Sequence, residues 1–218
     1  PQCNCKSLST LHYSYTTAMP RAVICNLPTA LLRNEEKEKR RMNFKTNFET
    51  ERLFLRKPTI DDANAIFKNY AQDKDVTKYL TWIPHKSVET TKSYLEWCLK
   101  RADNGNYFPF VILLKSTNHL IGMIDFSIED HKACFGYVLA KDYWNKSYMS
   151  EALTTLTNEL LKTGEISRVW AFCDIENNAS MRVMEKAGME YEGILKRWLV
   201  NPNISEIPRD CHVYAKVN

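Results

Sequence analysis

The fold is decided by the stretch Gly136-Tyr137-Val138-Leu139-Ala140-Lys141-Asp142-Tyr143-Trp144-Asn145-Lys146-Ser147-Tyr148-Met149-Ser150-Glu151-Ala152. It opens with strand residues, continues as a compact polar loop and enters a helix expected over 149–163. Unsatisfied N–H groups at a helix start attract an anion, and the helix dipole alone contributes about 0.3–1 kcal/mol. Such loops also cap helices without binding a ligand. The stretch therefore predicts strand, loop and helix, and leaves anion binding to other features of the sequence.

Downstream of this stretch, strands and helices alternate. A strand is expected at 167–173 and a helix at 178–187, which ends at Gly188. Two final strands, joined by an Asn- and Pro-containing segment at 201–210, are expected at 189–200 and 211–217.

Upstream, Arg52-Leu53-Phe54-Leu55-Arg56 alternates like a strand, and Thr59 to Ala63 is typical of a helix start. A second helix is expected after Ser87, which is a good N-cap residue. Three runs rich in β-branched and aromatic residues predict an antiparallel meander at 107–115, 119–128 and 132–139.

The expected order is β-α-α-β-β-β-α-β-α-β-β, an α/β (α+β) architecture with a mixed central sheet of about seven strands flanked by about four helices. Residues 42–218 are long enough for one ordinary domain. Residues 1–41 show no sustained period of 2 or 3.6 and end in a charge run, so we expect a disordered or short helical extension.

The charge balance argues against a nucleic-acid partner. The net charge of the 218 residues is +4, but residues 1–41 hold seven Lys and Arg against three Asp and Glu, so residues 42–218 carry 23 of each sign. A nearly neutral domain lacks the basic face that neutralises phosphates. No stretch approaches the roughly 18 apolar residues of a membrane-spanning helix, and no membrane partner is expected.

The seven cysteines do not predict disulfides or a metal site. Cys3 and Cys5 lack the spacing and the second ligand pair of a zinc site, so no metal is expected. Four others stand singly among apolar or strand-like residues and are interpreted as buried free thiols: Cys98, Cys134, Cys173 and Cys211. Free thiols favour a reducing, cytoplasmic setting.

A second segment, read together with residues 136–152, carries a resemblance to a known family. Residues 173–189 read Cys-Asp-Ile-Glu-Asn-Asn-Ala-Ser-Met-Arg-Val-Met-Glu-Lys-Ala-Gly-Met. Together the two segments resemble the GNAT superfamily of N-acetyltransferases, and the closest pattern is that of the ribosomal-protein alanine N-acetyltransferases. Further matches are the opening 50–56, the Trp-Ile-Pro-His loop at 82–85 and the closing Pro-Arg-Asp-Cys at 208–211. The resemblance covers about Phe48 to Val217.

The resemblance implies a site for acetyl-CoA, the acetyl donor. In the family the loop cradles the CoA pyrophosphate, the preceding strand pairs with the pantetheine arm, and an Asn at the next helix start contacts that arm. The loop Asn145 and Ser147 replace glycines of the family pattern Trp-Gly-x-Gly-Tyr. Since Ser tolerates positive φ poorly, this departure predicts lowered CoA affinity. The implied CoA-binding residues are Tyr137, Val138, Leu139, Trp144, Asn145, Lys146, Ser147, Tyr148, Met149 and Asn177.

The candidate catalytic groups follow from positions where this sequence lacks the catalytic residues of its relatives. Relatives often place a Tyr seven residues after the helix-start Asn to protonate the departing thiolate, and here that position is Met184. Ser180, one turn earlier, is therefore the candidate donor, with a purely structural role as the alternative.

The general base is expected to be Asp125 on a central strand, because the strand Glu of some relatives falls on Phe172. Asp174, Glu129 and His85 compete with it. Tyr79 and Trp82 fall in the loop that flanks the acceptor channel in the family.

The implied reaction is direct attack of a neutral amine on the thioester, whose oxygen is polarised by N–H groups near Val138. Freeing a protonated α-amine at pH 7 costs about 1 kcal/mol, against roughly 4.6 kcal/mol for a lysine. A site without an obvious strong base thus favours a protein or peptide N-terminus. A small amine acceptor and a non-catalytic acetyl-CoA-binding module are the alternatives, and a homodimer is compatible with the resemblance.

Overall fold

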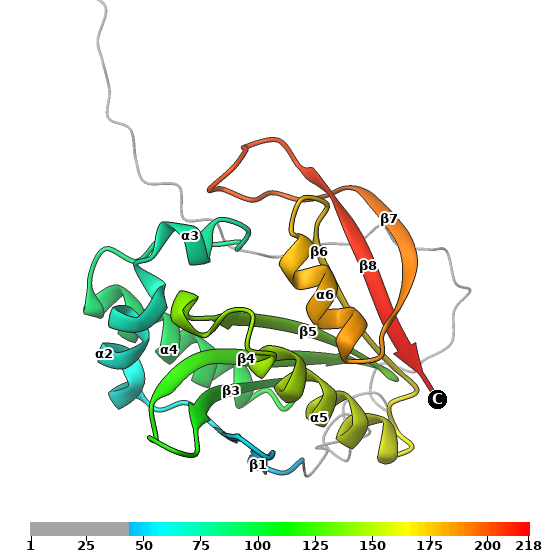
Figure 1. Cartoon of the computed structure of the whole chain (residues 1–218), viewed down its shortest axis with the longest axis horizontal. Helices are drawn as coiled ribbons and strands as arrows, with labels where there is room; N and C mark the ends of the chain where they lie inside the picture. Colours follow the sequence, from blue (N-terminus) through cyan, green and yellow to red (C-terminus); the bar gives the residue numbers. More distant parts are fainter. Residues whose placement is uncertain (1–43) are drawn as a thin grey trace, which may run out of the picture. The chain divides into compact units, whose positions relative to one another are not determined.

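The computed structural model describes residues 44–218, so the expected extension at 1–41 lies outside the described residues. The described chain forms one mixed sheet of eight strands in the order β1-β2-β3-β4-β5-β6-β8-β7, with five α-helices (Figure 1). The strands are β1 (Asn47–Glu49), β2 (Leu53–Arg56), β3 (Tyr107–Leu114), β4 (Leu120–Glu129), β5 (Lys132–Leu139), β6 (Arg168–Asp174), β7 (Glu190–Leu199) and β8 (Arg209–Val217).

The four predicted helices are present, and the structure adds a fifth, the four-residue α3, which is too short to show a helical period. The five helices are α2 (Ala63–Ile66), α3 (Lys74–Thr77), α4 (Val88–Ala102), α5 (Tyr148–Lys162) and α6 (Asn178–Lys186). The first predicted helix is composite, because a 3₁₀ turn at Ile60–Asp62 precedes α2 and a π-helical segment at Phe67–Ala71 follows it. Ser87 caps α4 as expected, since its hydroxyl oxygen accepts a hydrogen bond of 3.3 Å from the Thr90 N–H.

The sheet has one strand more than the sequence predicted. The additional strand, β1, has three residues and contributes only Phe48 to the core, too short a pattern to be recognised. The meander β3-β4-β5 is antiparallel as predicted, and β5 pairs with β6 in parallel.

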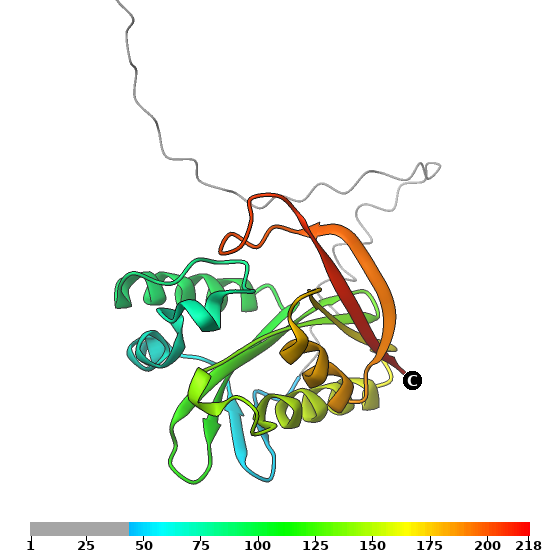
Figure 2. The same ribbon diagram turned by 45° about the horizontal axis from the view of Figure 1, so that its top comes forward.

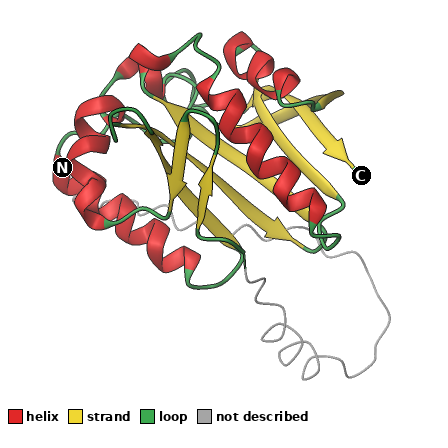
Figure 3. Cartoon of the chain, turned by 60° about the horizontal axis from the view of Figure 1, so that its bottom comes forward, coloured by secondary structure: helices red, strands yellow, loops and turns green. Residues whose placement is uncertain are grey.

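Helices cover both faces of the sheet (Figure 3). A first core lies between the sheet and the pair α5 and α6, and includes Phe126, Leu153 and Met184. A second core lies under α2 and α4, and includes Met123 and Leu95. The four predicted thiols are free; Cys134 is half-buried and the other three are buried.

A buried carboxylate fastens the ends of three strands. Asp174, at the end of β6, accepts hydrogen bonds from Arg209 Nε at 2.5 Å and from Asn201 Nδ2 at 2.8 Å. Burial raises the pKa of Asp174, but its hydrogen bonds and the nearby guanidinium outweigh burial, so the net pKa lies below the ordinary value. The β7–β8 loop is thereby tied to β6, and Figure 2 shows this loop reaching toward α3.

Removing the cation of this pair should destabilise the fold strongly. Arg209→Ala leaves a carboxylate buried without its partner, which typically costs about 3–5 kcal/mol. The free energy of urea unfolding at pH 7 measures the loss. The wild-type ion pair loses its contribution to stability as pH falls through the depressed pKa of Asp174. The difference in the free energy of unfolding between variant and wild type should therefore narrow below pH 3.8.

Lys196→Ala is the matched control, because Lys196 pairs with Asp210 at 2.8 Å but its side chain is 74% exposed. An exposed pair contributes about 0–1 kcal/mol. Equal losses in the two variants would contradict the assigned role of Arg209.

Candidate functional site

The central feature of the site is the parting of β5 from β6. Their parallel pairing ends at Phe135 and Ala171, although β5 continues to Leu139 and β6 to Asp174. On its other side β5 stays paired with β4 up to Leu139. One edge of the last four residues of β5 is therefore released from the sheet ladder, and its backbone groups can bind an extended ligand.

The loop after β5 has the backbone conformation that the family glycines would supply. Asn145 and Ser147 both have φ of +60°. The indole Nε1 of Trp144 donates to Leu139 O at 2.8 Å, which folds the loop back on the strand. Ser147 is the N-cap of α5 but does not cap it with its side chain. The sequence departs from the glycine pattern while the geometry keeps it, at the expense of two non-glycine residues in the left-handed region.

A network around Glu151 braces the start of α5. The Thr50 hydroxyl donates to its carboxylate at 2.5 Å, and Arg52 donates from Nε at 2.7 Å and from its backbone N–H at 2.9 Å. Arg52 also donates to Lys146 O at 3.1 Å, and its guanidinium lies 4.4 Å from the centroid of the Tyr148 ring. The loop is thus anchored to the beginning of β2, far away in sequence. No local pattern signals this contact.

Two hydroxyl groups meet where α6 begins beside β5. The hydroxyls of Tyr137 and Ser180 are 2.6 Å apart, and the Tyr137 oxygen also lies 3.2 Å from Ser180 O, so its one proton can be donated to either Ser180 oxygen. Asn177 is the N-cap of α6, and its Oδ1 accepts the Ser180 N–H at 3.1 Å. Met184 is fully buried in the first core. The arrangement brings together Tyr137, Asn177 and Ser180, but the hydroxyl pair itself was missed by sequence reasoning.

Asp125 lies on the opposite face of the sheet. It is paired with Gly136, and a Cβ at that glycine would be 3.4 Å from Asp125 Oδ1. Burial raises the pKa of Asp125 to about 7, although Arg101 and a hydrogen bond from Tyr107 act in the other direction. The carboxyl therefore lies next to the first residue of the parted segment of β5 and titrates near neutrality.

The predicted acceptor residues lie in a loop held from two sides. The Tyr79 hydroxyl donates to Glu176 O at 3.3 Å. Trp82 is half-buried against the second core, and its ring centroid lies 4.8 Å from that of His85. Asn203, in the β7–β8 loop, donates from Nδ2 to Thr77 O at 2.7 Å and to Trp82 O at 2.8 Å. The structure thus joins the loop of Tyr79 and Trp82 to the β7–β8 loop.

Neither a membrane helix nor a metal cluster is found in the described part of the chain. No helix among residues 44–218 is both long and apolar enough to cross a membrane. In the same residues no group of three or more His, Cys, Asp and Glu side chains is placed to hold a metal ion.

Comparison with known proteins identifies the family. Residues 52–190 match the family model described as the acetyltransferase (GNAT) domain. The uncharacterized N-acetyltransferase YnaD of Bacillus subtilis is 33% identical over 158 residues, which cover 71% of this chain and 88% of YnaD. The chain belongs to the GNAT acetyltransferases, and it is an N-acetyltransferase by family and by relatives.

Solved structures agree with this assignment. A GNAT-family acetyltransferase from Bacillus anthracis shares 31% identity, with a TM-score of 0.68 over 78% of this chain and 98% of that one. Two structures at 23% identity share the fold. They are the microcin C7 self-immunity acetyltransferase MccE in complex with acetyl-CoA and AMP, with a TM-score of 0.70 over 78% of this chain and 94% of that one, and the ribosomal-protein-S5-alanine acetyltransferase of Vibrio fischeri, with a TM-score of 0.68 over 80% and 97%.

Ser147→Gly should stabilise the protein relative to Ser147→Ala. Both changes remove the hydrogen bond of 3.1 Å that Lys186 Nζ donates to Ser147 Oγ, but only glycine relieves the left-handed backbone. The expected difference in the free energy of unfolding is about 1 kcal/mol or somewhat more. Equal stability of the two variants in urea unfolding would mean that the left-handed conformation carries no strain.

Asp125→Asn should stabilise the protein in a pH-dependent way. A folded-state pKa raised to about 7 means that wild-type stability falls as pH rises from the ordinary value of 3.8 through 7. The neutral amide avoids this loss. The free energy of unfolding of the variant should therefore rise relative to that of the wild type over this pH range, and the difference should stay constant above pH 7. Unfolding at a series of pH values measures the gap. Asp103→Asn, whose side chain is 77% exposed, is the control and should show no comparable gap.

Proposed function

We propose that this protein transfers the acetyl group of acetyl-CoA to the N-terminal α-amine of a polypeptide, of the ribosomal-protein alanine type. The observation that carries the proposal is the released edge of β5 leading into a loop with two residues at positive φ and an uncapped helix start. A strand edge fits the amide-containing pantetheine arm, and free amides at a helix start fit the pyrophosphate.

The donor would be bound by the residues expected from the sequence. The backbone from Tyr137 to Leu139 would pair with the arm, and the loop from Trp144 to Met149 would face the phosphates. MccE binds acetyl-CoA on the same fold. The Ser in place of the second glycine is expected to reduce this affinity, because glycine permits a closer approach of the backbone to phosphate than Ser does.

The acceptor side favours a weakly basic amine. Asp125, with a pKa near 7, is matched to accept a proton from an α-amine of pKa about 7.7–8.0 at neutral pH. The alternatives fit less well. Asp174 is engaged by Arg209 with a lowered pKa, and the pKa of His85 is lowered by burial while its Nδ1 lies 2.8 Å from Thr91 Oγ1.

The fold neighbours support the polypeptide acceptor. The Vibrio fischeri neighbour is a ribosomal-protein-S5-alanine acetyltransferase, and two others are apo and CoA-bound forms of a ribosomal L7/L12 α-N-protein acetyltransferase. Free thiols at Cys98, Cys173 and Cys211 fit a cytoplasmic setting, where such substrates are made. Tyr79 and Trp82 would line the approach of the acceptor.

A peptide panel tests the proposal. Purified protein with acetyl-CoA should add one acetyl group, read by mass, to peptides with a free N-terminal Ala or Ser. The matched control carries a blocked N-terminus and one internal Lys, which should remain unmodified because its amine is mostly protonated at pH 7. Acetylation of polyamines or aminoglycosides alone would replace the polypeptide acceptor by a small amine. Acetylation of the blocked peptide would overturn the assignment to α-amines.

A further inference from the structure

Ser180 does not stand alone at the start of α6. Its hydroxyl lies 2.6 Å from the Tyr137 hydroxyl, a short separation for two oxygens. Tyr137 comes from β5, within the segment that has left β6, and Ser180 comes from the first turn of α6. Two elements distant in sequence thus place two hydroxyls in contact beside the parting of the strands.

The pair shares two protons, and their arrangement decides what Ser180 can do. If Ser180 donates to Tyr137, the phenol donates to Ser180 O, 3.2 Å away, and the Ser180 proton is engaged. If Tyr137 donates to Ser180 Oγ instead, the Ser180 proton is free for a third group. Since each hydroxyl has one proton, a departing thiolate can be protonated by Ser180 only in the second arrangement.

The surroundings keep the phenol protonated. Burial raises the pKa of Tyr137 well above its ordinary value, and a hydrogen bond with Ser180 offsets only part of that. The thiol of Cys173 lies in hydrogen-bond contact with Ser180, and burial raises the pKa of this thiol to about 12, so it stays protonated. The phenol of Tyr137 therefore stays protonated and can donate a hydrogen bond across the working pH range, and no neighbouring thiolate competes for its proton.

We propose that Tyr137 is a positioning residue for thiol release: its hydroxyl donates to Ser180 Oγ and thereby directs the Ser180 proton to the sulfur of CoA. This inference rests on the proposed function. The amine nitrogen forms a bond to the acetyl carbon, and as the C–S bond breaks, its electron pair stays on sulfur, which takes the Ser180 proton. Ser180 recovers a proton from water, and the proton lost by the amine leaves through Asp125 to water. The Tyr137 donation also stabilises the negative charge on Ser180 Oγ before it is reprotonated.

Three variants test the coupling: Tyr137→Phe, Ser180→Ala and the double variant. Ser180→Ala should lower kcat by about 10²–10⁴-fold. Tyr137→Phe should lower kcat by at least tenfold, and the double variant should be no slower than Ser180→Ala, because both residues act on one proton. The dissociation constant of acetyl-CoA should stay within twofold throughout. The solvent deuterium effect on kcat, measured in parallel, should change in Tyr137→Phe, which a merely structural role would not cause.

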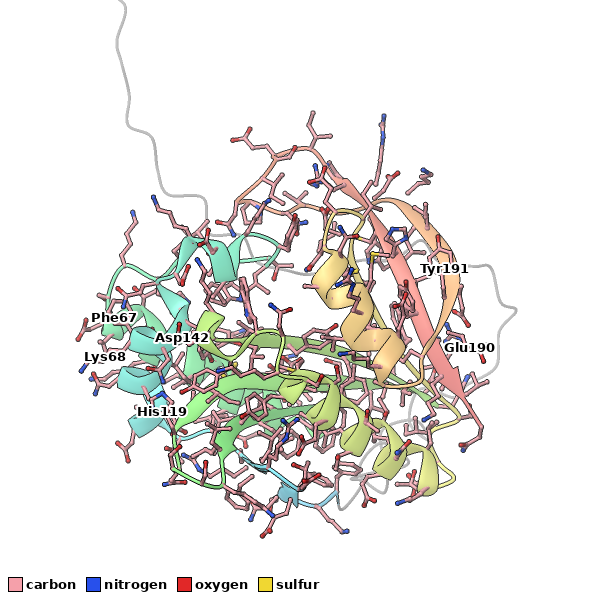
Figure 4. The ribbon with its side chains drawn as sticks, in the orientation of Figure 1. Phe67, Lys68, His119, Asp142, Glu190 and Tyr191 are labelled. Atoms are coloured by element: carbon pink, nitrogen blue, oxygen red, sulfur yellow. The ribbon has the colours of Figure 1, made fainter. Side chains whose placement is uncertain are left out.

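The matched control is Tyr191→Phe. Tyr191 lies on the edge strand β7 and is 51% exposed. In Figure 4 it lies far from Asp142, which belongs to the loop after β5. This variant should keep wild-type kcat. If Tyr137→Phe reduces the folded fraction, kcat is taken per acetyl-CoA site, counted by stoichiometric binding.

The outcomes separate this inference from the proposed function. A wild type that acetylates no peptide or amine overturns the proposed function and this inference with it. An active wild type together with full kcat in Tyr137→Phe overturns the inference alone. Multiplicative losses in the double variant also overturn it, because the two hydroxyls would then act independently.

Discussion

The parting of β5 and β6 is the constraint on which the rest of the structure depends. A sheet that opens in its middle gives up hydrogen bonds along one edge of β5, and those groups need partners. The molecule tolerates the opening because each parted strand is held from its far side. β5 remains paired with β4, and β6 remains paired with β8 as far as Asp174 and Cys211. Trp144 covers Leu139 O at the end of the released edge.

The two groups that we propose to carry protons lie on different faces of the sheet. Side chains alternate between the faces of a strand, so neighbouring residues of β5 serve different faces. Tyr137 faces the first core and meets Ser180 there, whereas Gly136 leaves room for Asp125 on the other face. A base and an acid in direct contact would exchange their proton with each other. If Asp125 is the base and Ser180 the acid, as we propose, the sheet keeps them apart although both lie beside residues 136–139 of β5.

The sequence predicts the fold well because most of its elements are long and strongly patterned. The meander, α5, α6 and the Ser87 cap follow from local periodicity and capping chemistry. β1 does not, because three residues with a single buried side chain carry no period. The site divides in the same way. The loop and Ser180 follow from a resemblance along the chain, whereas the contacts of Glu151 with Thr50 and Arg52, and of Asp174 with Arg209, join residues far apart in sequence. No local signal encodes such pairs.

The side-chain amide of Asn203 joins the β7–β8 loop to the loop that carries Tyr79 and Trp82. Asn203 donates to the carbonyl of Thr77 at the end of α3 and to the carbonyl of Trp82 in the loop that follows. Two residues earlier, Asn201 donates to Asp174 at the end of β6. These hydrogen bonds hold the two loops in a fixed position relative to each other. A change in either loop should therefore affect the other, and if Tyr79 and Trp82 line the approach of the acceptor, as we propose, acceptor preference depends on both segments. Grafting one loop from a relative without its partner would transfer a shape without the support that holds it.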